Sequence, residues 1–210
     1  MSNFYNFLKE EKEYGAIEQS LRKTGKTAVF GCIDGAKAHL IQSLCSDFDC
    51  KLIITADEIR AKQLVEEYKN FDEQTLYFPP KDFLFFSADI HGNLLARERI
   101  LALSSLLENE HCTIVTTIDA CLNPLLPPEQ MKKSTCTLKV GDVLHLNQLS
   151  RKLILMGYER TSQVVAAGQF SIRGGIIDIF SLTEVNPVRI ELWDDEIDSI
   201  RSFDCESQRS

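Results

Sequence analysis

The stretch GQFSIRGGIIDIFSLTEVNPVRIELWDDEIDSIRSF, residues 168–203, determines the fold of the C-terminal part of this 210-residue chain. Apolar and polar residues alternate along it in short runs broken by Gly, Asn and Pro. This pattern is typical of half-buried antiparallel strands joined by turns. In VRIELW the alternation places the aliphatic side chains on one face of the strand and Arg189 and Trp193 on the other. The sequence therefore predicts a small antiparallel sheet with one polar face.

The polar face of this predicted sheet is a candidate binding surface. In QFSIR the same alternation buries Phe170 and Ile172 and directs Arg173 outward. Trp193 lies between charged residues on the outward face, and Trp together with Arg is the composition of binding hot spots. Periodicity is equally consistent with a Trp193 ring that lies flat on its own sheet under an Arg guanidinium, as a cation–π contact within the fold. Both interpretations stay open at this point.

Two blocks of this region resemble a known module. GQFSIRGGIIDIF and VRIELWDDEIDSIRSFDCESQRS cover most of the last 43 residues. They closely resemble the module shared by the bacterial nucleotide-excision-repair helicase UvrB and the transcription-repair coupling factor (Mfd). Because two long blocks match, the resemblance is more specific than a single short motif. The N-terminal half of the chain distinguishes the two families.

The composition is that of a soluble globular protein, with 44% hydrophobic and 26% charged residues. No apolar run approaches a membrane span, and the N-terminal residues lack the pattern of a signal peptide, so we expect a cytoplasmic protein. The net charge of -8 argues against a large nonspecific DNA footprint, although it leaves a local basic patch open. Seven cysteines without a CxxC pair and four scattered histidines predict neither a metal site nor a catalytic set.

The N-terminal half alternates between short apolar segments and helical patterns. TAVFGC, KLIIT, TLYF and CTIVTT read as strands, and longer amphipathic segments separate them. Strands that alternate with helices indicate a parallel sheet covered by helices, which is the α/β class. The predicted fold is thus a P-loop or RecA-like parallel-sheet domain followed by a small α+β domain with an antiparallel sheet.

The loop after the first predicted strand tests for a nucleotide site. A P-loop reads GxxxxGK[ST], in which backbone amides wrap the phosphates, Lys contacts them and the hydroxyl binds magnesium. Here GCIDGAKA begins at Gly31 and keeps Lys37, but Ala36 replaces the second glycine and Ala38 removes the metal ligand. Asp34 also places a carboxylate where a phosphate would lie. We therefore predict a nucleotide-binding fold that binds no nucleotide.

This degenerate loop favours one of the two families. UvrB has an intact P-loop, whereas the N-terminal region of the coupling factor is a degenerate copy that does not hydrolyse ATP. UvrB also inserts an aromatic-rich hairpin that clamps DNA, and the span from FPPKDFLFFSADI to TTIDACLNPLLPPEQM is too short for one. Phe83, Phe85 and Phe86 are consistent with a remnant of a DNA-contacting surface or with a loop packed on the sheet. The coupling factor is the better match.

A proline-containing segment separates the two predicted domains. LNPLLPPEQM, residues 122–131, reads as a short extended hinge, so we expect an α/β domain over residues 1–132 and an α+β domain over residues 133–210. In the second domain TCTLKVGD predicts a strand and turn, LNQLSRKLILMG a helix that ends at Gly157, and YERTSQVV an edge strand.

The resemblance implies a non-catalytic module, without cofactor or metal, that docks the repair protein UvrA. Carried over by motif, the UvrA-binding residues are Arg173, Arg189 and Trp193, the last replacing the Phe usual in the family. The sequence stops inside the second block, so we expect a segment of a longer protein. That protein would be an ATP-dependent DNA translocase that binds RNA polymerase and DNA and covers the UvrA site with a C-terminal domain.

Two other hypotheses remain at this stage. A nucleotide-dependent UvrB-like helicase domain with a divergent P-loop rests on Lys37 alone, and it predicts saturable binding of ATP with magnesium. A DNA-damage binder predicts salt-sensitive affinity for duplex or bubble DNA.

Overall fold

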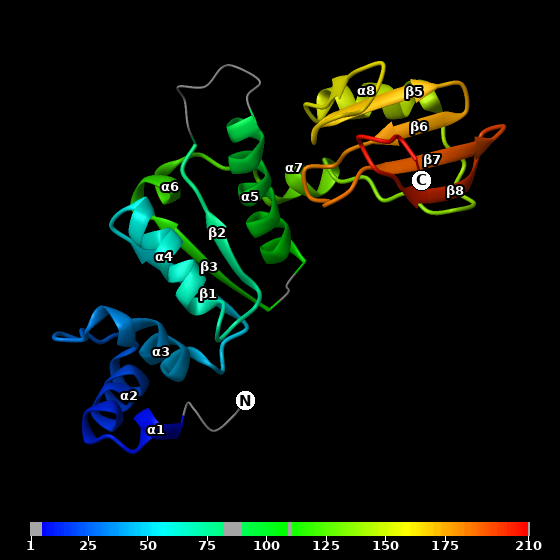
Figure 1. Ribbon diagram of the computed structural model, residues 1–210. Coiled ribbons are helices and arrows are strands. Elements are labelled where there is room, and N and C mark those ends of the chain that lie inside the picture. Colours follow the sequence, from blue (N-terminus) through cyan, green and yellow to red (C-terminus); the bar gives the residue numbers. More distant parts are fainter. Residues whose placement is uncertain (1–5, 82–89, 109–110, 210) are drawn as a thin grey trace. The chain divides into compact units, whose positions relative to one another are not determined.

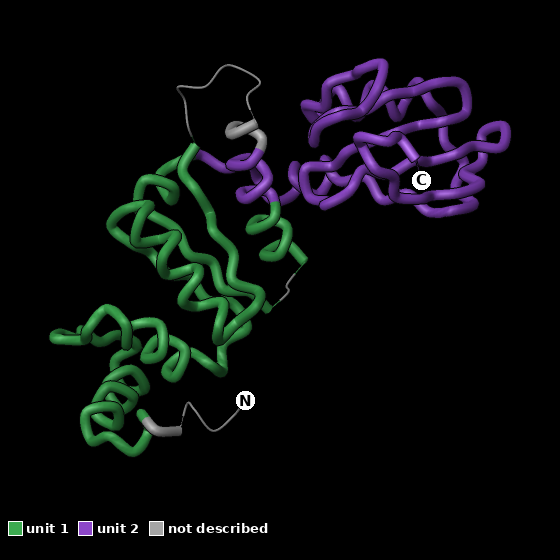
Figure 2. The backbone as a smooth tube through the Cα atoms, in the orientation of Figure 1, with its two compact units in different colours: residues 1–81, 101–123 green, residues 82–100, 124–210 purple. Residues whose placement is uncertain are grey.

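The computed structural model describes residues 6–81, 90–108 and 111–209 (Figure 1). Phe83, Phe85 and Phe86 lie outside these residues. The chain forms two compact units, drawn in Figure 2: unit 1 is residues 1–81 and 101–123, and unit 2 is residues 82–100 and 124–210. The domain boundary between residues 132 and 133 stays a prediction. No helix in the described part of the chain is long and apolar enough to cross a membrane.

Unit 1 contains a three-stranded parallel sheet, as the alternation of strands and helices predicts. Its strands are β1 (Cys50–Thr55), β2 (Thr75–Phe78) and β3 (Cys112–Thr117), in the order β1-β3-β2. The central strand β3 is buried along its whole length. A parallel sheet must be covered on both faces, and this explains why CTIVTT is a nearly continuous apolar run.

Helices cover the two faces of this sheet (Figure 1). On one face, side chains of α4 (Glu58–Tyr68) pack against Tyr77 and Val115. On the other face, Ala102 of α5 (Ile90–Leu107) packs against Ile114. Three further helices precede the sheet in the chain, namely α1 (Asn6–Lys9), α2 (Lys12–Thr24) and α3 (Asp34–Cys45).

The predicted first strand, TAVFGC, does not form. Residues 27–32 are irregular, and Phe30 is 91% exposed. Gly25 ends α2 in the left-handed conformation, and Gly31, with φ of 78°, turns the chain into α3. The segment has the apolar composition of a strand but is paired with no strand among the described residues, so its backbone groups remain open to water. The expectation of a strand before the degenerate P-loop was wrong.

The predicted hinge is only partly extended. A short helix, α6 (Ile118–Leu122), follows β3, and the chain runs on without regular structure to Pro127. Pro128 then begins α7 (Pro128–Lys133), because proline is tolerated in the first helical turn, where its missing N–H would have no partner.

Unit 2 combines helix α8 (Leu146–Leu155) with a five-stranded sheet in the order β4-β5-β6-β7-β8. All neighbouring strands are antiparallel except the edge pair β4–β5. Gly157, with φ of 91°, follows the helix as predicted. The strands are β4 (Glu159–Arg160), β5 (Gln169–Arg173), β6 (Ile176–Ile179), β7 (Val188–Trp193) and β8 (Glu196–Ser202).

The predicted strand TCTLKVGD is not a strand. Among the described residues it reaches the sheet through backbone hydrogen bonds, from Gly141 N–H to the Ile197 carbonyl at 2.8 Å and from Ile197 N–H to the Asp142 carbonyl at 2.9 Å, and the residue after it, Val143, forms an isolated bridge with Glu196. Leu138 of the segment and Leu144, two residues after it, still pack into the core. Their apolar character therefore reflects burial rather than strand pairing.

The core of unit 2 lies between α8 and the sheet. The side chains predicted to point inward, among them Phe170 and Ile190, do so, and Ile177 of β6 is buried beside them. Leu149 and Leu153 of α8 pack on them. The opposite face of the sheet carries the polar residues that the sequence singled out.

Candidate partner-binding face

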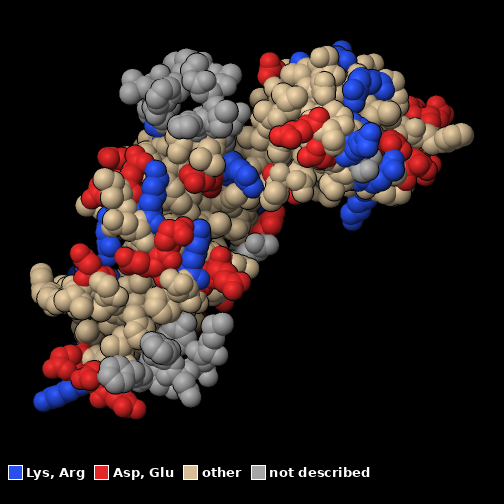
Figure 3. Space-filling model, viewed as in Figure 1, with Lys and Arg blue, Asp and Glu red and all other residues tan. Residues whose placement is uncertain are grey.

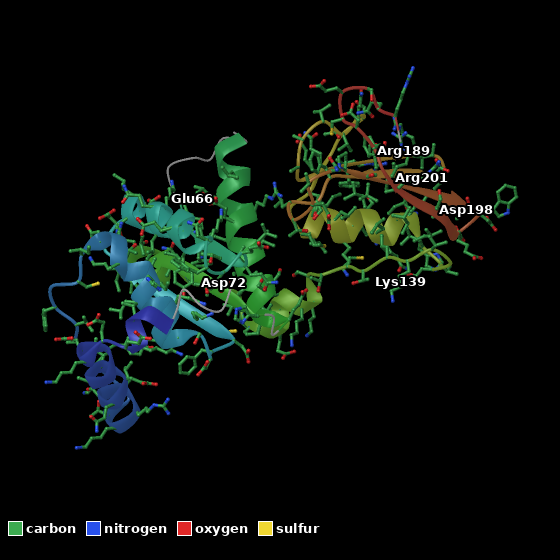
Figure 4. All side chains as sticks on the ribbon, turned by 60° about the horizontal axis from the view of Figure 1, so that its bottom comes forward. Glu66, Asp72, Lys139, Arg189, Asp198 and Arg201 are labelled. Carbon is green, nitrogen blue, oxygen red and sulfur yellow. The ribbon has the colours of Figure 1, made fainter. Side chains whose placement is uncertain are left out.

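The strand register gathers charged side chains on the face of the unit 2 sheet opposite its core. Asp178 of β6 lies directly opposite Arg189 of β7, and Arg189 lies opposite Arg201 of β8. Figure 4 shows Arg189 and Arg201 close together on this sheet. In Figure 3, basic side chains gather on the viewed face of unit 2, bordered by acidic ones. We call this surface the arginine face, and its members are the charged residues Arg173, Asp178, Arg189, Glu191 and Arg201.

The centre of the arginine face is Asp178, which is fully buried. The Nε of Arg189 donates to Asp178 Oδ1 at 2.7 Å, and its Nη2 donates to Oδ2 at 3.0 Å. The Nη2 of Arg173 donates to the same Oδ2 at 2.5 Å. One carboxylate therefore joins two of the three predicted partner-binding residues.

Arg189 points to the predicted face but is not exposed there. Its Nη1 donates to the Gln208 carbonyl at 3.1 Å, and its guanidinium carbon lies 4.6 Å from the centre of the Phe203 ring. Only 14% of the side chain is exposed. The hydrogen bond to Asp178 raises the pKa of Arg189 further above its ordinary value, so the residue stays charged. Truncation of Arg189 would leave Asp178 and the Gln208 carbonyl without this partner, so Arg189 also contributes to the fold.

Arg173 is more accessible than Arg189, with 47% of its side chain exposed. It ends β5 at the turn formed by Gly174 and Gly175. Gly174 has a φ of 61°, and a Cβ added at Gly175 would lie 3.2 Å from the Leu192 carbonyl oxygen. The two glycines therefore allow the tight turn that places Arg173 at the end of its strand.

Trp193 is 82% exposed at the end of β7. Asp194, with φ of 58°, forms the turn into β8, and a register shift between Glu191 and Leu192 precedes it. No cation–π contact of Trp193 occurs among the described residues. Such exposure does not fit a ring that lies flat beneath an Arg of its own sheet, and the binding role of Trp193 stays a prediction. Trp193 lies four residues from Arg189, about 13 Å along an extended strand.

The degenerate P-loop has its own internal ion pair. Lys37 Nζ lies 2.6 Å from Asp34 Oδ1, and Arg60 Nη2 lies 3.9 Å from the same oxygen. The hydrogen bond from Lys37 lowers the pKa of Asp34 below its ordinary value. Ala36 and Ala38 lie on α3 and supply neither flexibility nor an oxygen ligand. The Lys37 ammonium, which a P-loop directs at phosphate, thus binds a carboxylate of its own helix.

A second buried carboxylate, Asp72, stabilises the sheet of unit 1. It accepts a hydrogen bond from Thr113 Oγ1 at 2.6 Å, and Lys51 Nζ and His111 Nε2 each lie 3.4 Å from its Oδ2. Burial alone would raise the pKa of Asp72, but the hydrogen bond from Thr113 and the charge of Lys51 outweigh it and lower the pKa below the ordinary value. This network joins the three strands at their N-terminal ends.

Sequence analysis missed Asp178 and Gln208. Asp178 occupies the one polar position of IIDI, which is a signal for an outward-facing side chain. Its pairing with Arg189 depends on the strand register, which the sequence does not give. Gln208 lies in the irregular C-terminal segment, for which no periodicity exists.

Comparisons with known proteins show what this chain is similar to. Residues 136–210 match the UvrB interaction domain family. The whole chain is 33% identical to the transcription-repair-coupling factor of Bacillus subtilis (strain 168) over 214 residues, and to those of Staphylococcus aureus strains USA300 and MRSA252 over 213 residues. The alignments cover all of this chain and 18% of each relative, so the chain spans less than a fifth of their length. Residues 136–210 are thus similar to the UvrB interaction domain family, and the chain along its whole length is similar to part of the transcription-repair-coupling factors.

Proposed function

We propose that this chain is the non-catalytic module of a transcription-repair coupling factor that recruits the repair protein UvrA to stalled RNA polymerase. The observation that carries the proposal is the match of residues 136–210 to the UvrB interaction domain family, because that region contains the arginine face and Trp193. The similarity of the whole chain to transcription-repair-coupling factors supports the cellular process.

The proposed UvrA-binding residues are Arg173, Arg189 and Trp193. Arginine recognises carboxylates through paired hydrogen bonds, and an exposed Trp supplies a large apolar area at small entropic cost. An acidic surface next to an apolar pocket on the partner would complement this arrangement.

The absence of catalysis is part of the proposal. The alternative, a nucleotide-dependent helicase domain, depends on Lys37, whose ammonium is hydrogen-bonded to Asp34. Titration with a fluorescent ATP analogue in the presence of magnesium tests the alternative. We expect no saturable binding of the analogue. Saturable binding at micromolar concentrations would contradict our proposal and support the helicase hypothesis.

The rest of the proposal concerns the longer protein. We propose that it is cytoplasmic and acts as an ATP-dependent DNA translocase, that it binds RNA polymerase and DNA, and that another of its domains covers the arginine face until it is needed. These features follow from the resemblance to the coupling factor.

Isothermal titration calorimetry of this chain with UvrA from the same organism tests the proposed function. We expect a saturable one-site isotherm for the unmodified chain. Asp198→Ala provides a control, because Asp198 is exposed on β8 and carries none of the proposed contacts. Gel-shift experiments on duplex and bubble DNA at low salt test the alternative that the chain is a DNA-damage binder. That hypothesis requires the chain to bind DNA in the absence of UvrA.

A further inference from the structure

The two arginines of the proposed site differ in how many of their donors are already used. A guanidinium has five N–H donors on three nitrogens. In Arg189 all three nitrogens donate within the chain, two to Asp178 and one to the Gln208 carbonyl. Phe203 lies against the same guanidinium. Two of its five N–H donors make no hydrogen bond among the described residues, but with only 14% of the side chain exposed little of this guanidinium is accessible to another protein.

Arg173, in contrast, is more exposed and uses fewer of its hydrogen-bond donors within the chain. Among the described residues its only hydrogen bond runs from Nη2 to Asp178 Oδ2, and nearly half of its side chain is exposed. Its Nε, its Nη1 and the second N–H of its Nη2 thus remain without a hydrogen bond, so one edge of the guanidinium, formed by Nη2 with either Nε or Nη1, stays open to an incoming carboxylate. The contact to Asp178 fixes one end of a long and otherwise flexible side chain, which lowers the entropy lost on binding.

Asp178 connects the two arginines. The two positive charges and the one carboxylate leave the group with a single net positive charge. Since Arg189 is mostly buried and Arg173 is not, this charge is presented to solvent at Arg173. Asp178 is itself fully buried, so no partner can contact it directly.

We propose that Asp178, held in place by Arg189, is a positioning residue that orients Arg173 toward a carboxylate of the partner. Arg173 makes the direct contact, and Arg189 acts through Asp178. This inference rests on the proposed function, and it assigns different roles to two residues that the sequence treats alike.

A double-mutant cycle for UvrA affinity tests the proposal. The four proteins are the unmodified chain, Arg173→Ala, Asp178→Asn and the double variant, each measured by calorimetry with UvrA. We expect Asp178→Asn to weaken binding about tenfold in the unmodified chain and less than about twofold in the Arg173→Ala background, because its effect passes through Arg173. A loss of the same size in both backgrounds, as from a general structural defect, overturns the proposal.

Ser171→Ala is the matched control. Ser171 lies directly opposite Asp178, and its buried hydroxyl has no hydrogen-bond partner in the described part of the chain. Its truncation changes the surroundings of Asp178 without removing a charge, and we expect unchanged affinity. A tenfold loss in this control would show that any change beneath the face weakens binding, and it would also overturn the assignment to Asp178.

A second cycle covers the case in which Asp178→Asn does not fold. Arg189→Lys keeps a cation beside Asp178 but lacks the planar fork that makes two hydrogen bonds. We expect its effect on UvrA affinity to disappear in the Arg173→Ala background. An undiminished effect contradicts indirect action of Arg189. If the unmodified chain does not bind UvrA at all, the proposed function fails, whereas binding with additive losses refutes only the positioning role.

Discussion

Arg189 links the proposed site to the stability of the fold. Its guanidinium makes three hydrogen bonds and is mostly buried, and its removal leaves a buried carboxylate with one fewer cation. Breaking a buried ion pair by removing one partner costs about 3 kcal/mol. We expect Arg189→Ala to lower the free energy of unfolding of unit 2 by about this amount, measured by urea denaturation.

Ser171→Ala is again the reference for this measurement. The buried Ser171 hydroxyl has no hydrogen-bond partner among the residues that the structure describes, so removing it relieves a desolvation penalty of about 1 kcal/mol. The free energy of unfolding of Ser171→Ala should therefore be unchanged or slightly higher. Should Arg189→Ala prove as stable as Ser171→Ala, the ion pair with Asp178 would make no net contribution to folding.

The ionisation of Asp72 should make the free energy of unfolding of unit 1 depend on pH. Because its pKa is lowered in the folded state, its stabilisation is fully present above the unfolded pKa of about 3.9 and is lost as the pH falls through the lower folded value. We expect the stability difference between the unmodified chain and Asp72→Asn to be large at pH 7 and to shrink below about pH 4. Urea unfolding at a series of pH values measures it.

The comparison with Asp198→Asn gives the baseline for the pH series. Asp198 is exposed and forms no ion pair among the described residues, so its substitution should leave a small difference at every pH. A difference for Asp72→Asn that stayed constant down to pH 3 would contradict the assignment of the ion network.

At the scale of elements, the hairpin of β7 and β8 presents Trp193 away from the core. Since the side chain is 82% exposed, Trp193→Ala should leave the melting temperature within about 2 °C of the unmodified chain. UvrA affinity should fall about 30-fold, as for a hot-spot truncation of about 2 kcal/mol. Calorimetry and thermal melts on the same samples separate the two effects.

Trp193→Phe is the conservative counterpart of that variant. It keeps an aromatic ring of smaller area and matches the residue usual at this position in the resembling family. We expect it to retain most of the affinity. Equal losses for Phe and Ala would mean that the indole N–H, rather than the apolar ring, makes the contact.

The strand pairing that the sequence predicted is that of strands close together in the chain, whereas KLIIT, TLYF and CTIVTT were predicted correctly as strands without their order in the sheet. Strands β5 to β8 follow one another, so the alternation in residues 168–203 and the turn residues between the strands together determine the pairing. TAVFGC has the same apolar character but no adjacent partner, and it remains irregular. TCTLKVGD contributes Leu138 to the core without entering the sheet. Hydrophobic pattern indicates which side chains can be buried, and it does not reveal whether a strand edge is available.

The candidate site was likewise predicted only as far as the hydrophobic pattern allows. Alternation gave the direction of Arg173, Arg189 and Trp193 correctly. It could not show that Asp178 would occupy the donors of Arg189, because this depends on a cross-strand register. The hydrogen bond from Arg189 to the Gln208 carbonyl depends on an irregular segment 19 residues further along the chain.

At the scale of the whole molecule, the described apolar side chains that form the core cluster of unit 2 lie within residues 138–200. A core that is closed within one segment can form without the remainder of the chain. We expect residues 133–210, produced alone, to fold and to bind UvrA within about threefold of the affinity of the whole chain. Calorimetry with both proteins makes the comparison, and residues 1–132 serve as the non-binding control. Loss of binding in a folded 133–210 fragment would place part of the site in the N-terminal half.

The contrast between the two sheets also bears on the order in which they form. In the meander of β5 to β8, each strand pairs with the next along the chain, whereas β1 must meet β3 across 62 positions, from Cys50 to Cys112. Closing a short loop costs less entropy and proceeds faster than closing a long one. After dilution from denaturant, amides of the meander should therefore gain protection from hydrogen exchange before those of β1 and β3. The slower N-terminal sheet would then be the part most exposed to misfolding and to capture by chaperones.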